Sequence, residues 1–182
     1  MERKLSTILA LDVVGFSKLM ATDEDMTVAV LKQSRELIDL IIVEHGGRMF
    51  GSAGDSVIAE FPSPVKATEC AVKIQSKMQA INENIPENQK MRFRVGVNIG
   101  DVMIADDNLY GDAINVAARL EAKAEPEGIC ISKSVFDMVS EKVKASFENA
   151  GKLDLKNIEV PGEAYFVIQS NGAARFMQHT DA

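Results

Sequence analysis

One stretch limits the fold more than any other, the apolar segment Ile8–Phe16 with the sequence ILALDVVGF, because it carries a single carboxylate. Its apolar residues predict a short buried strand, and Gly15 predicts a sharp turn at its end. Asp12 lies within this strand, where a charge is costly unless a cation or a basic side chain pairs with it. The fold must therefore supply Asp12 with a bound cation or a basic partner.

The composition narrows the class of protein. The chain has 182 residues, of which 46% are hydrophobic and 26% charged, as expected for one globular domain with a substantial core. The net charge of −7 argues against a nucleic-acid partner, because such proteins carry basic patches. A nucleotide held through metal ions stays compatible with this charge, since the cation supplies the positive charge.

Two further features indicate the setting. Cys70 and Cys130 lack a CxxC spacing, which is typical of core thiols in a reducing, cytoplasmic protein. No apolar run reaches the roughly 20 residues that cross a bilayer, so we expect no membrane segment. We expect one domain over residues 1–169 and a polar tail over residues 170–182. A regulator or sensor would belong to domains outside this chain.

The hydrophobic periodicity predicts an α+β chain with a ferredoxin-like βαββαβ core followed by extra strands and helices. A polar connector is expected after Phe16, and Thr22 is expected to cap the first helix. In chain order, the expected elements are a strand at 8–14, a helix from 22 to 46, a hairpin of strands 48–50 and 56–61 around a turn at 51–54, a chain break at 62–64, a helix after it that ends near 86, a strand at 91–100 with a partner at 101–105, a helix from 111 to 124, a strand at 128–131, a helix from 132 to 139, and strands near 147–155 and 164–169.

This topology predicts a pair of carboxylates. In a ferredoxin-like fold the third strand lies between the first two and runs antiparallel to the first. The end of the first strand therefore lies beside the start of the third, where Asp12 and Asp55 are found. Hard cations such as Mg²⁺ are bound by one or two carboxylates together with phosphate oxygens. The spacing alone gives similar weight to the alternative, in which Asp12 is a salt-bridged structural acid and Asp55 an ordinary turn residue.

Five motifs, in order, resemble the catalytic domain of class III adenylate and guanylate cyclases, most closely the soluble proteobacterial branch. They span residues 5–168 and read ALDVVGFSKLM, GSAGDSVIAEF, VGVNIGDV, YGDAINVAARLEAKAEPEGICIS and LKNIEVPGEAYFV. The resemblance implies the nucleotide cyclase fold and conversion of a nucleoside triphosphate to a 3′,5′-cyclic nucleotide and pyrophosphate. It also implies a homodimer in which each active site is shared between two chains.

The resemblance also assigns roles to individual residues. Asp12 and Asp55 are similar to the family's aspartates that bind two divalent ions, Mg²⁺ or Mn²⁺. The remaining matches are Gly15 and Phe16 for a main-chain phosphate contact, Asn115 for the ribose, Arg119 for the α-phosphate in the transition state and Lys156 for the terminal phosphates. A planar and permanently charged arginine suits charge that develops on phosphorus. Asn115 and Arg119 are four residues apart, so one helix face presents both.

The positions that read the base depart from the family pattern. Where adenylate cyclases commonly have a lysine and an aspartate or threonine, this chain has Gly51 and Asn108. Glycine has no side chain with which to read a base, and asparagine can donate to or accept from either purine. The glutamate–cysteine pair that selects guanine is absent as well. We favour ATP, because the most similar relatives are adenylate cyclases, and keep GTP as the alternative.

Three other functions were compared with this interpretation. A cyclase-like module with weak or no turnover would have lost a metal-binding aspartate or the asparagine–arginine pair, and all four residues are present. A diguanylate cyclase would need a GGDEF-type hairpin, which GSAGDSVIAEF is not. A purely structural ferredoxin-like domain leaves the buried acids unexplained. The sequence therefore favours an active cyclase.

Overall fold

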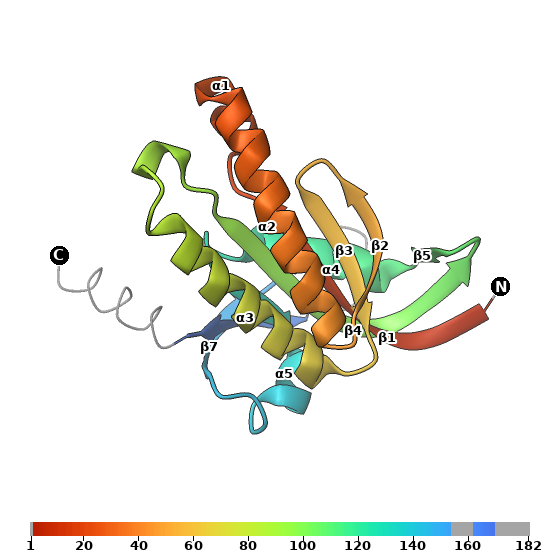
Figure 1. Cartoon of the computed structure of the whole chain (residues 1–182). Helices are drawn as coiled ribbons and strands as arrows, with labels where there is room; N and C mark the ends of the chain where they lie inside the picture. Colours follow the sequence, from red (N-terminus) through yellow and green to blue (C-terminus); the bar gives the residue numbers. More distant parts are fainter. Residues whose placement is uncertain (1, 154–161, 170–182) are drawn as a thin grey trace.

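The computed structural model describes residues 2–153 and 162–169, and Figure 1 shows the arrangement of their helices and strands. The elements are β1 (Glu2–Val13), α1 (Phe16–Thr22), α2 (Glu24–Glu44), β2 (Arg48–Ala53), β3 (Ser56–Phe61), α3 (Pro64–Asn82), a 3₁₀ turn η1 (Glu87–Gln89), β4 (Phe93–Ala105), β5 (Asn108–Tyr110), α4 (Asp112–Lys123), β6 (Ile129–Ser132), α5 (Lys133–Val139), β7 (Ser146–Lys152) and β8 (Glu163–Ile168).

The sheet order is β2-β3-β1-β4-β6-β8-β7, with β5 paired to β4 beside this path. Within it, β3 lies between β1 and β2 and runs antiparallel to both, and β4 is antiparallel to β1. This confirms the predicted ferredoxin-like core. The elements after β4 extend that core, which confirms the extra C-terminal strands and helices.

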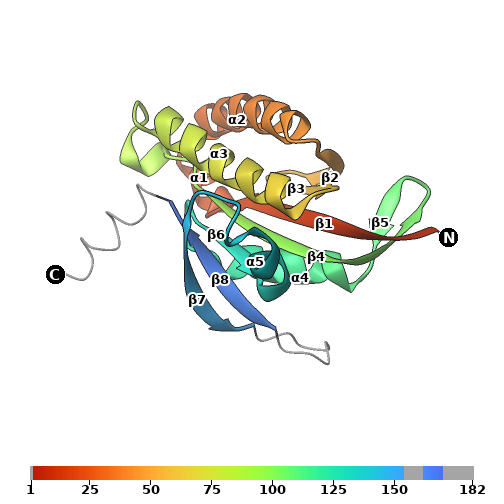
Figure 2. The same cartoon turned by 90° about the horizontal axis from the view of Figure 1, so that it is seen from below.

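Helices cover both faces of the sheet, as Figure 2 shows, with α2 and α3 on one side and α4 on the other. Successive residues of β1 point to opposite faces. Leu9 and Leu11 pack toward α2 and α3, whereas Ile8 and Ala10 pack toward α4. Asp12 continues the second series, so its carboxylate lies on the α4 side of the sheet. A strand buried on both faces explains the continuous apolar run in the sequence.

The segment expected as a polar connector is instead the short helix α1. Leu19 is buried, and its carbonyl accepts a hydrogen bond from Thr27 Oγ1 of α2 at 2.9 Å. This tertiary contact stabilises a helix that its polar residues alone did not predict. Asp23, not Thr22, caps α2, and its carboxylate accepts a hydrogen bond from the Met26 amide at 3.0 Å.

Two hairpins also differ from their expected boundaries. Strand β2 continues to Ala53, because its backbone pairs with β3 through the glycine-rich stretch that was expected to turn. Residues 101–105 are the end of β4 and not its partner; the partner is β5. The turn between β4 and β5 holds Asp106 and Asp107 with φ of 51° and 63°, the left-handed backbone that tight two-residue hairpins require.

The C-terminal elements agree better with the prediction. Ser132 caps α5, and its Oγ accepts a hydrogen bond from the Val135 amide at 3.3 Å. Strand β7 begins one residue earlier than expected and ends at Lys152. Among residues 2–153 and 162–169, no helix is both long and apolar enough to cross a bilayer.

Candidate active site

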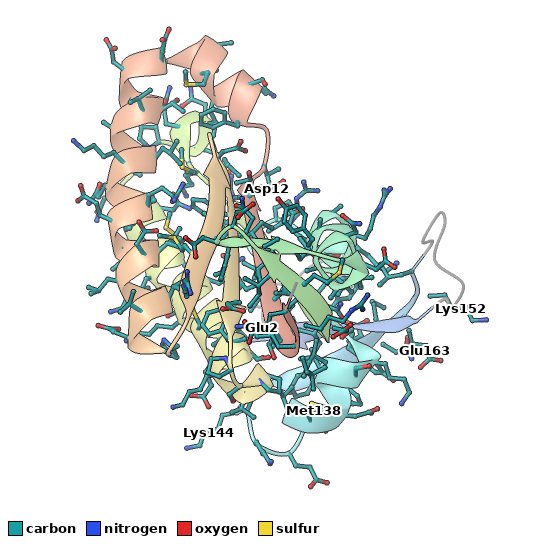
Figure 3. The ribbon with its side chains drawn as sticks, turned by 90° about the vertical axis from the view of Figure 1, so that its right-hand side faces the viewer. Glu2, Asp12, Met138, Lys144, Lys152 and Glu163 are labelled. Atoms are coloured by element: carbon teal, nitrogen blue, oxygen red, sulfur yellow. The ribbon has the colours of Figure 1, made fainter. Side chains whose placement is uncertain are left out.

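Asp12 lies at the end of β1, between the buried residues Leu11 and Val13. Its side chain is 27% exposed, so it reaches the surface from an otherwise buried strand. Figure 3 shows Asp12 and Glu2 at the two ends of this strand. Beyond Asp12, Gly15 adopts the left-handed conformation with φ of 63°, and α1 begins at Phe16. In the described part of the chain no side chain caps α1, so its first amide groups are open to a ligand.

Asp55 lies at the same end of the β1–β3 pair as Asp12. The antiparallel register pairs Leu11 of β1 with Val57 of β3. This is the last pair of the β1–β3 ladder; Asp12 directly follows Leu11, and Asp55 lies in the turn two residues before Val57. The two carboxylates therefore share one edge of the sheet, although they are 43 residues apart in the sequence.

The structure adds a basic partner for Asp12 that sequence analysis did not identify. Arg94 faces Asp12 across the β1–β4 pair, and its Nη2 lies 3.4 Å from Asp12 Oδ1. The same guanidinium contacts α4, with Nη1 donating to the Ala122 carbonyl at 3.3 Å and Nε 3.6 Å from Glu121 Oε1. The Arg94 guanidinium thus contacts both Asp12 and α4.

Negative charge at this edge exceeds positive charge. Burial, a hydrogen bond to Asp12 and the charges of Asp12 and Asp55 together raise the pKa of Glu121 to about 8, while Arg94 opposes the shift. Neither Glu121 Oε1 nor Arg94 Nε has a hydrogen-bond partner, although both atoms are buried. One guanidinium therefore does not satisfy three carboxylates, which leaves a place for a further cation.

The donor set suits a divalent ion that also binds a ligand. Among the residues that the structure describes, no group of three or more histidine, cysteine or acidic side chains is arranged to hold a metal. Two carboxylates are nevertheless sufficient for Mg²⁺ when water and phosphate oxygens fill the other positions. The residues present therefore fit a metal that is shared with a phosphate substrate.

Asn115 and Arg119 lie on the exposed face of α4, whereas Glu121 is buried against the sheet. At 3.6 residues per turn, Arg119 points about 200° around the helix axis from Glu121. Because Glu121 lies beside Arg94 and Asp12, the Asn115–Arg119 pair points away from the aspartates of its own chain. The structure brings the two aspartates together and separates them from the asparagine–arginine pair.

Gly51 and Asn108 belong to β2 and β5, which approach each other. Arg48 Nη2 at the start of β2 lies 4.0 Å from Asp107 Oδ1 in the turn before β5. Asn108 is exposed, and no heavy atom lies within 4 Å of a Cβ built at Gly51. This region is therefore open on the surface. Lys156 lies outside the described residues.

The comparisons with known proteins decide the family. The sequence model described as the adenylate and guanylate cyclase catalytic domain matches residues 2–169. The chain belongs to this cyclase family. The putative adenylate cyclase 3 of Rhizobium meliloti (strain 1021) is 43% identical to the cyclase chain over 160 residues, which cover 87% of the chain and 27% of that protein. The cyclase chain thus spans about a quarter of the length of this curated relative.

Solved structures agree with the family assignment. A crystal structure described as an adenylate/guanylate cyclase/hydrolase from Silicibacter pomeroyi is 38% identical to the cyclase chain, with a TM-score of 0.84 over 93% of this chain and 99% of that chain. The adenylyl cyclase CyaB from P. aeruginosa gives a TM-score of 0.79 at 22% identity, over 93% and 97% of the two chains. The second comparison supports the fold alone.

The cyclase site contains two residues that sequence analysis missed, Arg94 and Glu121. A signal for Arg94 was available, because it alternates with the buried residues Phe93 and Val95 and so must face the same side of the sheet as Asp12. The signal for Glu121 was weaker. It was an acid on the apolar side of α4, next to Leu120, and nothing in the sequence indicated which partner it would meet.

Proposed function

We propose that this cyclase domain is a lyase that converts ATP to 3′,5′-cyclic AMP and pyrophosphate for signal transduction. The observation that carries the proposal is the Asp12–Asp55 pair with its excess of negative charge. It lies beside the turn at Gly15, where the first amides of α1 have no side-chain cap. A cation and the phosphates of a nucleotide supply what these two features lack.

Asp12 and Asp55 are the residues that would hold two divalent ions, Mg²⁺ or Mn²⁺. Bound there, such ions would supply Lewis acidity toward the ribose 3′-hydroxyl and positive charge for the triphosphate. The chain's contribution is to place one carboxylate at the end of β1 and the other in the turn that leads into the neighbouring strand β3. The sheet would then hold both at the same edge while the substrate enters.

Other residues of the chain would bind and orient the nucleotide. The amides of Gly15 and Phe16 would donate to phosphate oxygens. Asn115 would hold the ribose so that its 3′-hydroxyl faces the α-phosphate, and Arg119 would bind the charge that develops there. Lys156 would bind the terminal phosphates, a role that rests on its motif alone.

We propose a homodimer with two shared sites. The support is the direction of Asn115 and Arg119, which point away from Asp12 and Asp55 of the same chain. A two-fold partner could present its own pair to these aspartates, and a two-fold axis would repeat the arrangement at a second site. Each chain would then contribute its aspartates to one site and its asparagine–arginine pair to the other.

ATP is the proposed substrate, with GTP as the second candidate. The name of the 43% identical relative, a putative adenylate cyclase, supports ATP. Gly51 and Asn108 would flank the base, and neither dictates a purine by its hydrogen-bonding groups. The choice of base therefore rests on the relative and not on a contact.

The proposed setting is the cytoplasm. Cys70 and Cys130 are both buried and free, which suits a reducing compartment. We also propose that residues 1–169 form the catalytic domain and that residues 170–182 are a polar tail. Because the chain spans about a quarter of a relative, domains elsewhere in a longer protein would provide regulation.

The decisive test is cyclic nucleotide formation by the purified protein with Mn²⁺ or Mg²⁺ and either ATP or GTP. We expect cyclic AMP from ATP, and loss of at least about a hundredfold in rate for Asp12→Asn and Asp55→Asn with folding retained. If a confirmed dimer forms no cyclic product from either nucleotide, the chain is a cyclase-like binding module and the proposal fails.

Mixing two inactive variants tests the shared site. Asp55→Ala and Arg119→Ala each damage one half, so a mixed dimer has one intact site and one doubly damaged site. Random pairing makes half of the dimers mixed, so about a quarter of the wild-type activity should return. No recovery in dimers shown to be mixed would contradict the shared site.

A further inference from the structure

Glu121 is an acid in a position where packing favours an apolar residue. It is 7% exposed on α4, and its backbone lies against Gly96 of β4. Helix α4 packs this closely on β4 because residue 96 is a glycine: a Cβ at Gly96 would collide with backbone atoms of Ala117 and Glu121. Burying a carboxylate at so close a contact is costly and calls for a specific partner.

Glu121 has two partners at this contact: Asp12, with which it shares a hydrogen bond, and Arg94, whose guanidinium has a geometry that is unusual for an arginine beside an aspartate. Paired arginines commonly make two parallel bonds of about 2.7–2.9 Å to one carboxylate. Here Arg94 makes a single contact of 3.4 Å to Asp12, and it turns Nε toward Glu121 at 3.6 Å and Nη1 toward the Ala122 carbonyl at 3.3 Å. The guanidinium thus contacts both Asp12 and α4, and its contact with Asp12 is the shorter of its two carboxylate contacts.

We infer that Glu121 is a positioning residue that acts through Arg94: it keeps the guanidinium from closing onto Asp12, so that the Asp12 carboxylate stays available to a divalent cation. The inference rests on the proposed metal site. Without an acceptor at position 121, Arg94 would turn to its nearest other carboxylate, which is Asp12. A two-bond pair would form there and compete with the cation.

This arrangement also gives α4 two roles. Its outer face carries Asn115 and Arg119 for one site of the proposed dimer, while Glu121 on its inner face acts on Asp12, which belongs to the other site. A shift of α4 along the sheet would change both sites together. Through its contact with Arg94, Glu121 therefore links α4 to the aspartate pair of its own chain.

The test is a titration of the full chain with Mn²⁺, without nucleotide, followed by electron paramagnetic resonance. Glu121→Met removes the acceptor at similar volume, and we expect Mn²⁺ affinity to fall about tenfold. Glu121→Gln keeps an oxygen next to the Arg94 guanidinium, and its affinity should stay within about twofold of the wild type. Adding Arg94→Met to Glu121→Met removes the competing guanidinium, so affinity should return.

Matched controls separate positioning from folding. Glu60 is equally buried at 7% exposure on the same sheet and is held by Lys4 and Ser6 at 2.9 Å. Glu60→Met makes the same chemical change and should leave Mn²⁺ affinity unchanged. Thermal denaturation checks that each variant is folded, and Glu121→Ala provides the same comparison if the methionine variant does not fold.

Two results would overturn the inference. One is wild-type Mn²⁺ affinity in Glu121→Met. The other is an equal loss of affinity in the double variant, since loss without Arg94 cannot come from its closing onto Asp12. Asp12→Asn shows whether the measured ion is bound at this site. If the wild type and Asp12→Asn bind Mn²⁺ alike, the proposed metal site itself fails, and the inference fails with it.

Discussion

At the scale of single residues, Asp12 is both held by the protein and exposed to a ligand. The strand that carries it is buried on both sides, yet the carboxylate reaches the surface at the strand end. Sequence analysis found this acid because its apolar neighbours make it conspicuous, and it left open whether a cation or a basic side chain pairs with it. The structure supplies Arg94, and the long contact that Arg94 makes with Asp12 leaves room for the cation that the proposed function requires.

Glu121 gives the unfolding free energy a pH dependence in metal-free protein. Its pKa is about 8 in the folded chain against an ordinary value of 4.5, so the folded state binds the proton more tightly. The resulting stabilisation is complete below pH 4.5 and is lost as the pH rises through 8. Glu121→Gln cannot titrate, so its stability relative to the wild type should rise over this interval. Urea denaturation of both proteins across this interval measures the effect, and a constant difference would contradict it.

Gly51 allows a test of base selection. A side chain at this position meets open space, so Gly51→Lys should fold normally. An ammonium group only donates hydrogen bonds, and N1 of adenine accepts one whereas N1 of guanine carries a hydrogen. We expect the ratio of kcat/KM for ATP to that for GTP to rise about tenfold, which corresponds to one charged hydrogen bond.

The control for base selection is Gly51→Ala, which adds bulk without a donor and should leave the ratio unchanged. Equal ratios in the lysine variant and the wild type would place the base elsewhere.

At the scale of elements, the contact between β4 and α4 determines the geometry of the site. Gly96 and Gly100 lie under the helix, and a Cβ at either glycine would collide with α4. This close approach brings Glu121 to Arg94 and turns Asn115 and Arg119 outward. Sequence periodicity predicted a strand and a helix here, although it ended the strand too early, and it could not reveal how closely the two elements pack.

Gly96→Ala should therefore be among the more damaging small substitutions. The added methyl group meets backbone atoms of Ala117 and Glu121, which cannot turn away as a side chain would. We expect a loss of about 3 kcal/mol in the free energy of unfolding, measured by urea denaturation. Gly51→Ala, where the methyl group meets nothing, is the matched control, and equal stability of the two variants would argue against the close packing.

Some elements could be predicted from the sequence and others could not, for physical reasons. The apolar run of β1 and the alternation in β4 determined the core topology, and with it the meeting of Asp12 and Asp55. Helix α1 was missed because Leu19 is stabilised by its packing against α2 and not by local propensity. The ends of β2 and β4 were misplaced because strand pairing, which depends on distant residues, overrides the turn tendency of glycine and aspartate.

At the scale of the whole molecule, the proposed reaction requires two chains. The aspartates and the asparagine–arginine pair point in different directions from one rigid sheet-and-helix layer. The sequence predicted both groups of residues, but their separation in one chain becomes visible only when the directions of side chains on α4 are known. The expectation of a dimer came from the similarity of the motifs to the cyclase family and not from the pattern of residues.

Activity should accordingly depend on protein concentration. Specific activity is expected to be constant while the chain is dimeric and to fall in proportion to the dimer fraction on dilution, because a monomer contains no complete site. Assays over a dilution series, matched to sedimentation velocity at the same concentrations, test this. Undiminished specific activity in a solution of monomers would contradict the shared site.

The central position of β1 has a consequence for hydrogen exchange. Between Thr7 and Leu11 this strand pairs with β3 on one side and β4 on the other, so its amides should exchange with deuterated water only when the whole sheet opens. Asp12 directly follows this stretch, whereas Asn108 lies on β5, a strand of three residues paired to β4 at the sheet's side. Asp12, which would hold the metal, therefore follows the part of the chain whose amides should exchange most slowly. Asn108, which would meet the base, lies in a part whose amides should exchange among the fastest.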